Sequence, residues 1–121
     1  MDGTWFTDLA DELTRCLVDA ERCAASCEEL LATVRSASDS ATQKVVVDAV
    51  VPPAAIARVL IELIDHPPRI VLAACRLCHE SAQAAVWELE AVVAHLDCAE
   101  AVAALRSSAR SCERLLEAAR V

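Results

Sequence analysis

One apolar seam constrains the first part of the chain more than any other feature. Its members recur at alternating steps of four and three residues: Leu9, Leu13, Cys16, Ala20, Cys23, Cys27, Leu30 and Val34. This heptad spacing is typical of a helix face that packs against neighbouring helices. A helix over residues 5–35 would be about 45 Å long at 1.5 Å per residue. The chain is therefore predicted to open with a long helix that needs partner helices to cover its seam.

A second helical segment is expected to start at Ser40, because Ser40 followed by Gln43 has the spacing of a capping box. Its valine-rich stretch, residues 45–51, would also suit a strand. No other segment of the chain offers that strand a partner, so a helix is the preferred interpretation. Proline disrupts a helix interior, so we expect this helix to be kinked or broken near Pro52 and Pro53.

Two more helices complete the pattern. Pro67 and Pro68 fit the first turn of a third helix, which should extend to about Val93. Its apolar positions fit two alternative seams, one through His79 and one through Cys78. Asp97 followed by Glu100 is an acidic variant of the capping box and predicts the start of a fourth helix. The seam of that helix is Cys98, Val102, Leu105, Ala109, Cys112, Leu116 and Ala119.

Four amphipathic helices with mostly short connections predict one architecture. The fold class is all-α, an up-down-up-down four-helix bundle that forms a single domain over residues 1–121. Composition agrees, because 56% of the residues are hydrophobic and the chain has one glycine. With few aromatic residues, the core must be filled by leucine, valine, alanine and cysteine.

The charge and the N-terminal residues limit the possible partners and location. A formal net charge of −8 argues against binding to nucleic acid or to anionic lipid. No stretch of about 18 residues is free of charge, so no membrane span is expected. Residues 1–8 have neither the basic start nor the apolar stretch of a secretory signal. We therefore expect a cytoplasmic protein, in which seven cysteines favour free thiols, metal ligation or catalysis over disulfides.

The predicted topology brings the cysteines into groups. One group should lie near one end of the bundle with His79 beside it: Cys16, Cys75, Cys78 and Cys112. Cys27 and Cys98 should lie toward the other end, and Cys23 between the two groups. Thiolates suit soft ions such as Cu(I), and also Zn(II). All seven cysteines and His79 are therefore candidate metal ligands.

The spacing of the cysteines leaves several chemistries open. Cys23 and Cys27 are four residues apart and Cys75 and Cys78 are three apart, so each pair shares a helix face and could hold Cu(I). A closed zinc site needs four converging ligands. Residues 75–79 also match C-x-x-C-H, the attachment motif of c-type haem. Alternatively, the cysteines could be core filling alone, since free cysteine packs as a small hydrophobic side chain.

Four cysteine-containing segments together resemble a known family. The segments are Cys16-x6-Cys23-x3-Cys27 and residues 74–80, 97–100 and 111–114. They resemble the cysteine-rich four-helix bundle family of bacterial copper storage proteins. The resemblance implies Cu(I) bound by thiolates inside the bundle, and often assembly into oligomers. The second helix has no cysteine and only residues 23 and 27 keep the C-x3-C spacing, so we expect a few ions and not a filled core.

Three functions therefore stay open: a Cu(I)-binding bundle, a non-metal interaction or ligand-binding bundle, and an enzyme that uses metal or haem. No catalytic set is evident from the spacings, so enzymatic activity is the least favoured. The second helix is apolar over a wide arc, which favours a homodimer through Ile56, Val59, Leu60, Leu63 and Ile64. Trp87 is expected to pack beside the core or to anchor a subunit contact.

Overall fold

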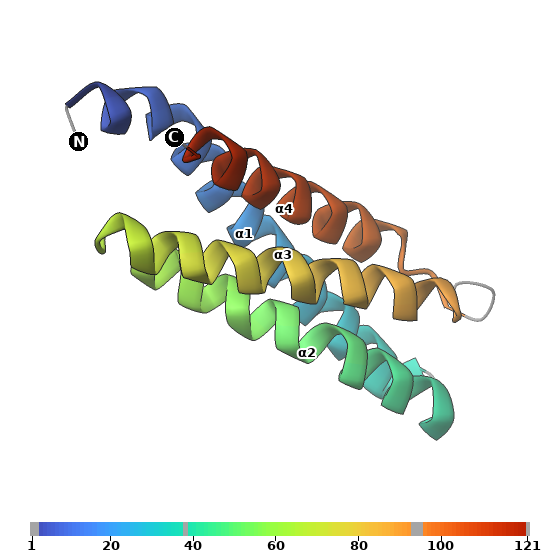
Figure 1. Cartoon of the computed structure of the whole chain (residues 1–121). Coiled ribbons are helices and arrows are strands. Elements are labelled where there is room, and N and C mark those ends of the chain that lie inside the picture. The colour runs from blue at the N-terminus through green and yellow to red at the C-terminus, as the bar shows by residue number, and fades with distance from the viewer. Residues whose placement is uncertain (1–2, 38, 93–95, 121) are drawn as a thin grey trace.

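A computed structural model describes residues 3–37, 39–92 and 96–120 of the chain. These residues form four α-helices and no strand (Figure 1). The helices are α1 (Gly3–Ala37), α2 (Ser40–Leu63), α3 (Pro68–Glu90) and α4 (Ala99–Ala118). The predicted fold class, an all-α four-helix bundle, is confirmed.

Successive helices run in opposite directions, as an up-down-up-down bundle requires (Figure 1). Helices α1 and α3 each pack against both α2 and α4, so α1 and α3 lie diagonally across the bundle. The start of α1, the end of α4 and the α2–α3 connection lie at one end of the bundle (Figure 1). In the part of the chain that the structure describes, no helix is long and apolar enough to cross a bilayer.

The core follows the predicted seam of α1 and part of that of α4, where Val102, Leu116 and Ala119 are only partly buried. The α1 seam is buried from Leu9 to Val34, except that Leu13 is only partly buried. In α3 the structure selects the seam through Cys78, whereas His79 of the alternative seam is partly buried. Both seams of α3 share Cys75, which is fully buried. Trp87 does not pack beside the core as one expectation had it, because 79% of its surface is exposed.

Helix α2 is continuous through the region that was ambiguous in sequence. Residues 45–51 are helical, and the helix passes through Pro52 and Pro53 without a break. Proline has no N–H, so the carbonyls of Asp48 and Ala49 lose their usual donors four residues later. Pro53 is buried in the core. Packing of α2 against α1 and α3 therefore keeps the helix intact despite the two missing bonds.

The start of α2 lies close to the predicted position, with a different capping residue. The N-cap is Asp39, whose extended backbone precedes the helix and whose carboxylate accepts the Thr42 N–H at 2.8 Å. Ser40 is already the first helical residue, so its assignment as the cap is wrong by one position. A carboxylate next to the positive end of the helix dipole is a strong cap, which explains the choice.

The α3–α4 connection differs in a similar way. Helix α3 ends at Glu90, and the expected end at Val93 lies outside the described residues. The N-cap of α4 is Cys98, which makes no capping bond with its side chain. Asp97, the predicted cap, does accept a backbone hydrogen bond from Ala99 at 3.2 Å. The carboxylate therefore supports the helix start from one residue further back than a cap would.

Candidate metal centre

All seven cysteines are free thiols inside the bundle. None forms a disulfide, and none exposes more than 2% of its surface. The inward orientation predicted from the helical seams is therefore observed for every cysteine. Burial alone is also what core filling would produce. What the thiols can do chemically depends on how they lie relative to one another.

Three cysteines from three different helices converge near one end of the core. The Sγ atoms of Cys16 on α1, Cys75 on α3 and Cys112 on α4 all lie within 4.8 Å of one another. We call these residues the thiol trio. Sulfur ligands that share one ion at about 2.3 Å in a trigonal plane lie about 4 Å apart. The trio therefore needs only a small contraction to hold a single ion.

Interactions within the trio give the three thiols different pKa values. Bonds from Cys112 and then Cys16 lower the pKa of Cys75, although burial opposes them. The pKa of Cys112 is raised by its bonds with Cys16, Cys75 and Cys78 and by burial. For Cys16, the bond with Cys112 lowers the pKa, but the bond with Cys75 and burial outweigh it and raise the pKa. Cys75 is therefore the first thiolate of the trio.

Cys78 extends the trio toward the middle of the bundle. Its hydrogen bond with Cys112 lowers the pKa of Cys78, with burial opposing and Ser108 helping. The Cys78 Sγ and Ser108 Oγ atoms lie 3.5 Å apart, and Ser108 is buried. Ser108 also acts to lower the pKa of Cys23, whose thiol belongs to the next group, although other causes raise that pKa overall. The buried polar atoms thus form one continuous track along the bundle.

Cys23 and Cys27 form a second group, which we call the thiol pair. Both lie on α1, four residues apart, so a single helix face carries them. Their mutual hydrogen bond, together with burial, raises the pKa of Cys23. The same bond lowers the pKa of Cys27. Cys27 is therefore the thiol of the pair that ionises first.

Cys98 and His79 lie outside these groups. Cys98 caps α4, and its Sγ approaches the Leu89 carbonyl only at 4.0 Å. Burial and then the nearby Asp97 raise the pKa of Cys98. His79 is partly buried, and its Nδ1 lies 3.0 Å from the Ala109 carbonyl oxygen. A carbonyl only accepts, so Nδ1 donates this hydrogen bond. The structure does not bring that imidazole into the trio.

A comparison with known protein families bears on this arrangement. The family model for copper storage proteins (Csp) matches residues 9–117. The chain belongs to the copper storage protein family. The matched range contains all seven cysteines, and the resemblance inferred from the cysteine segments is confirmed. No curated protein and no solved structure matches the chain.

In this copper storage family member, the bundle end nearest the trio is hollowed. A cavity of about 210 Å³ lies between the start of α1, the α2–α3 connection and the end of α4. Leu13, Leu72 and Leu115 line it, and each is three residues from a trio cysteine on the same helix. Three residues correspond to about 4.5 Å along a helix. One layer of side chains therefore separates the trio from this cavity, whose lining also includes Asp65 and the exposed His66.

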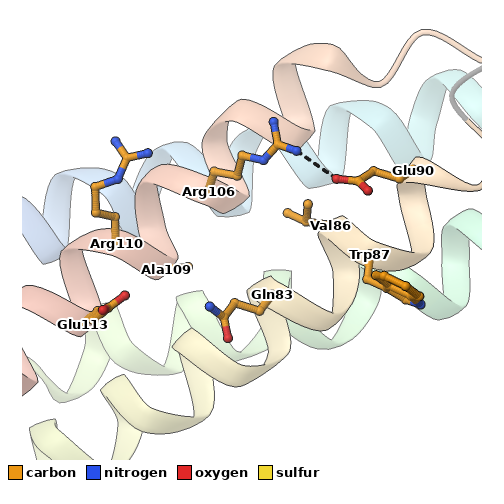
Figure 2. A pocket seen from close by; sticks show the side chains of 8 residues that line it. All are labelled: Gln83, Val86, Trp87, Glu90, Arg106, Ala109, Arg110 and Glu113. Carbon is orange, nitrogen blue, oxygen red and sulfur yellow. Dashed lines mark hydrogen bonds and ion pairs between the residues drawn. The ribbon is translucent and has the colours of Figure 1, made fainter.

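A second cavity on the surface is separate from the thiols. A groove of about 450 Å³ runs between α3 and α4, and no cysteine is among the residues that line it. Figure 2 shows the groove, with Arg106 and Glu90 joined across it by an ion pair of 2.8 Å. Trp87 lies on its α3 side. The groove is charged and open, so it belongs to the outer surface and not to the metal centre.

Sequence reasoning missed two buried serines that contact the thiols. Ser108 bonds with Cys78 and Cys23, and the Ser111 carbonyl accepts the Cys16 thiol at 3.2 Å. The buried face of α4 includes a second series with heptad steps: Ala101, Leu105, Ser108, Cys112 and Leu115. A polar residue in such an apolar series signals a buried hydrogen bond. That series, had it been followed beside the one through Ala109, would have identified Ser108.

Proposed function

We propose that this chain binds Cu(I) through thiolates inside the bundle, with the thiol trio as its principal site. The observation that carries the proposal is the approach of three Sγ atoms from α1, α3 and α4 to within 4.8 Å of one another. Thiolates are soft ligands that prefer Cu(I). Membership of the copper storage family supports the same ion.

The number of converging ligands favours Cu(I) over Zn(II). Structural zinc is almost always held by four ligands in a tetrahedron, whereas Cu(I) is satisfied by two or three thiolates. The trio supplies three, and Cys78 is hydrogen-bonded to Cys112 beside it. His79 is engaged with the Ala109 carbonyl through Nδ1. Covalent haem is disfavoured because Cys75 and Cys78 are fully buried within α3, where haem vinyl groups cannot reach them.

The proposed capacity is low. The trio would take one ion and the thiol pair a second, two-coordinate ion. Helix α2 contributes no thiol, and its core positions are filled by alanine, valine, leucine and proline. Because α2 presents no sulfur to the core, thiolates do not surround the core on all sides. A larger copper cluster would need such a lining. Free thiols and Cu(I) both require reducing conditions, which supports the cytoplasm as the place of action.

Self-association through α2 is the second part of the proposal, but Leu60 of the predicted interface is buried in the core and takes no part in it. Val51 and Val59 expose 41% and 48% of their surfaces. They lie eight residues apart on one side of the helix, with exposed Ala55 between them. An uncharged apolar stripe of this kind is what a homodimer would cover. Changing Val59 to Glu should shift the mass measured by light scattering from dimer to monomer.

A titration with Cu(I) tests the main proposal. The reduced protein, purified without oxygen, competes with a chromophoric Cu(I) chelator while bound copper and free thiols are counted. The control is a variant in which all seven cysteines are replaced by alanine or valine. We expect copper uptake that saturates at the trio and the pair and is absent from the control. Equal uptake by the two proteins would reject the proposal and leave the cysteines as core packing.

A further inference from the structure

Residue 111 makes two contacts between α4 and α1 directly beside the trio. Ser111 is 5% exposed, and its carbonyl oxygen accepts the Cys16 thiol at 3.2 Å. Its hydroxyl donates a hydrogen bond to Asp19 Oδ2. Cys16 and Asp19 are three residues apart on α1, so they face α4 together. One residue of α4 is therefore held at two points of α1.

These contacts matter because much of the buried face of α4, apart from Leu105 and Leu115, consists of short side chains. The buried face of α4 is rich in alanine, at 101, 104 and 109. Short side chains interdigitate little, whereas a single buried polar contact can fix the register of packed helices. A hydrogen bond to a carboxylate is also stronger than one between neutral groups. The bond from Ser111 to Asp19 is thus suited to fix the register of α4 against α1.

A slip in register would abolish the trio. One helical turn is about 5.4 Å, which exceeds the 4.8 Å within which the three Sγ atoms now lie. Cys112 directly follows Ser111, so whatever holds Ser111 against α1 also sets the position of the Cys112 thiol. The same contact holds Cys16 itself. The thiols of two helices are therefore positioned by one serine.

We propose that Ser111, through its bonds to Asp19 and Cys16, is a positioning residue that sets α1 against α4 so that the trio can bind one ion. The inference rests on the proposed function, since it concerns the geometry of that site. Neither Ser111 nor Asp19 is a metal ligand in this proposal. Their contribution is to hold Cys16 and Cys112 at the separation that the ion requires before it arrives.

The test compares variants on both sides of the bond. Ser111→Ala removes the hydroxyl but keeps the carbonyl, and Ser111→Thr restores a hydroxyl. Asp19→Ala removes the acceptor from a partly buried position, so it tests the same bond if Ser111→Ala does not fold. Ser81→Ala is the matched control, because among the described residues the Ser81 hydroxyl bonds to the Cys78 carbonyl of its own helix.

Two readouts separate this inference from the proposed function. The first is Cu(I) affinity and thiolate–Cu(I) luminescence; the second is the yield of Cys16–Cys112 bridging by dibromobimane, mapped by mass spectrometry without copper. We expect Ser111→Ala and Asp19→Ala to weaken Cu(I) binding about 10–100-fold, as loss of a residue that orients a ligand does. Stoichiometry should be unchanged. Bridging should fall several-fold, and Ser111→Thr should recover both readouts.

Each outcome has a distinct meaning. Wild-type affinity in Ser111→Ala and Asp19→Ala would overturn the positioning role, whatever their stability. A uniform loss that includes Ser81→Ala would also overturn it, because the effect would be general destabilisation. If the wild-type protein binds no Cu(I), the proposed function fails. The positioning of the two thiols would then stand or fall on bridging alone.

Discussion

The thiol trio and the thiol pair are two ways of bringing sulfur atoms together. The pair lies on α1 alone, where a four-residue spacing places Cys23 and Cys27 on one face. The trio draws on three helices, and its members are separated by tens of residues in the chain. Local helix geometry thus suffices for the pair, whereas the trio exists only when the bundle is assembled. The two sites should respond differently to the same perturbation.

Removal of one thiol should have the largest effect. Cys75→Ala takes away the thiol of the trio whose pKa is lowered. Loss of a ligand should weaken the principal Cu(I) site more than a hundredfold, since loss of a residue that merely orients a ligand already costs 10–100-fold. Competition with a Cu(I) chelator measures this.

Cys27→Ala is the matched comparison, because it leaves the trio complete. The strongest Cu(I) site of this variant should keep wild-type affinity. Total copper uptake should fall by one ion, the one that the pair would bind. Circular dichroism should show a folded bundle for both variants. Equal loss of affinity in the two proteins would mean that the trio and the pair are not separate sites.

The Cu(I) affinity of the trio should fall more steeply with decreasing pH than that of the pair. In the trio, Cys16 and Cys112 have raised pKa values and Cys75 a lowered one, so binding one ion displaces two protons. In the pair, the pKa of Cys23 is raised and that of Cys27 lowered, so binding displaces the proton of Cys23 and only part of a proton from Cys27. Below the ordinary thiol pKa of about 8.5, affinity should fall about a hundredfold per pH unit at the trio and by a smaller factor, between about tenfold and a hundredfold, at the pair. Affinities of Cys27→Ala and Cys75→Ala across neutral pH report each slope separately.

The same contrast explains what the sequence could predict. The fold follows from the heptad seams, because Leu9, Cys16 and Val34 reveal a buried helix face without reference to the other helices. The valines before Pro52 were ambiguous because strand propensity and helical spacing coexist there. This segment is helical in the structure, where α2 packs against α1 and α3. The sequence pattern was therefore sufficient to predict a helix wherever the apolar residues lie on one face of that helix.

For the metal centre, the sequence could predict only which cysteines lie at a similar depth in the bundle. Counting along the helices grouped Cys16, Cys75 and Cys112, but it could not separate the imidazole of His79 from them. The structure does so by directing its Nδ1 to the Ala109 carbonyl. Ser111 could not be recognised either, since its partner Asp19 lies 92 residues away and is not part of the predicted seam of α1. Such contacts depend on helix rotation, which spacing within one helix does not fix.

Copper should stabilise the fold through the trio in particular. The assembled trio is absent from the unfolded chain, so an ion held there favours the native state by mass action. At free Cu(I) a hundred times the dissociation constant, the free energy of unfolding should rise by about 2.7 kcal/mol. Urea unfolding with buffered Cu(I) measures this. Cys75→Ala should lose the gain, whereas Cys27→Ala should retain it, and an equal gain in both would contradict the contrast.

The smallest effect is expected at Ser108, which lies between the two sites and bonds to Cys78 and Cys23. Ser108→Ala removes a neutral hydroxyl whose distance to Cys78 is 3.5 Å, long for a strong bond, so unfolding should become easier by less than about 1 kcal/mol. Both Cu(I) affinities should stay near those of the wild type, because neither ion uses this oxygen. The chelator competition and the urea titration detect any departure. A large loss at the trio and the pair together would show that the buried track acts as one site, and the distinction between the two regions would then fail.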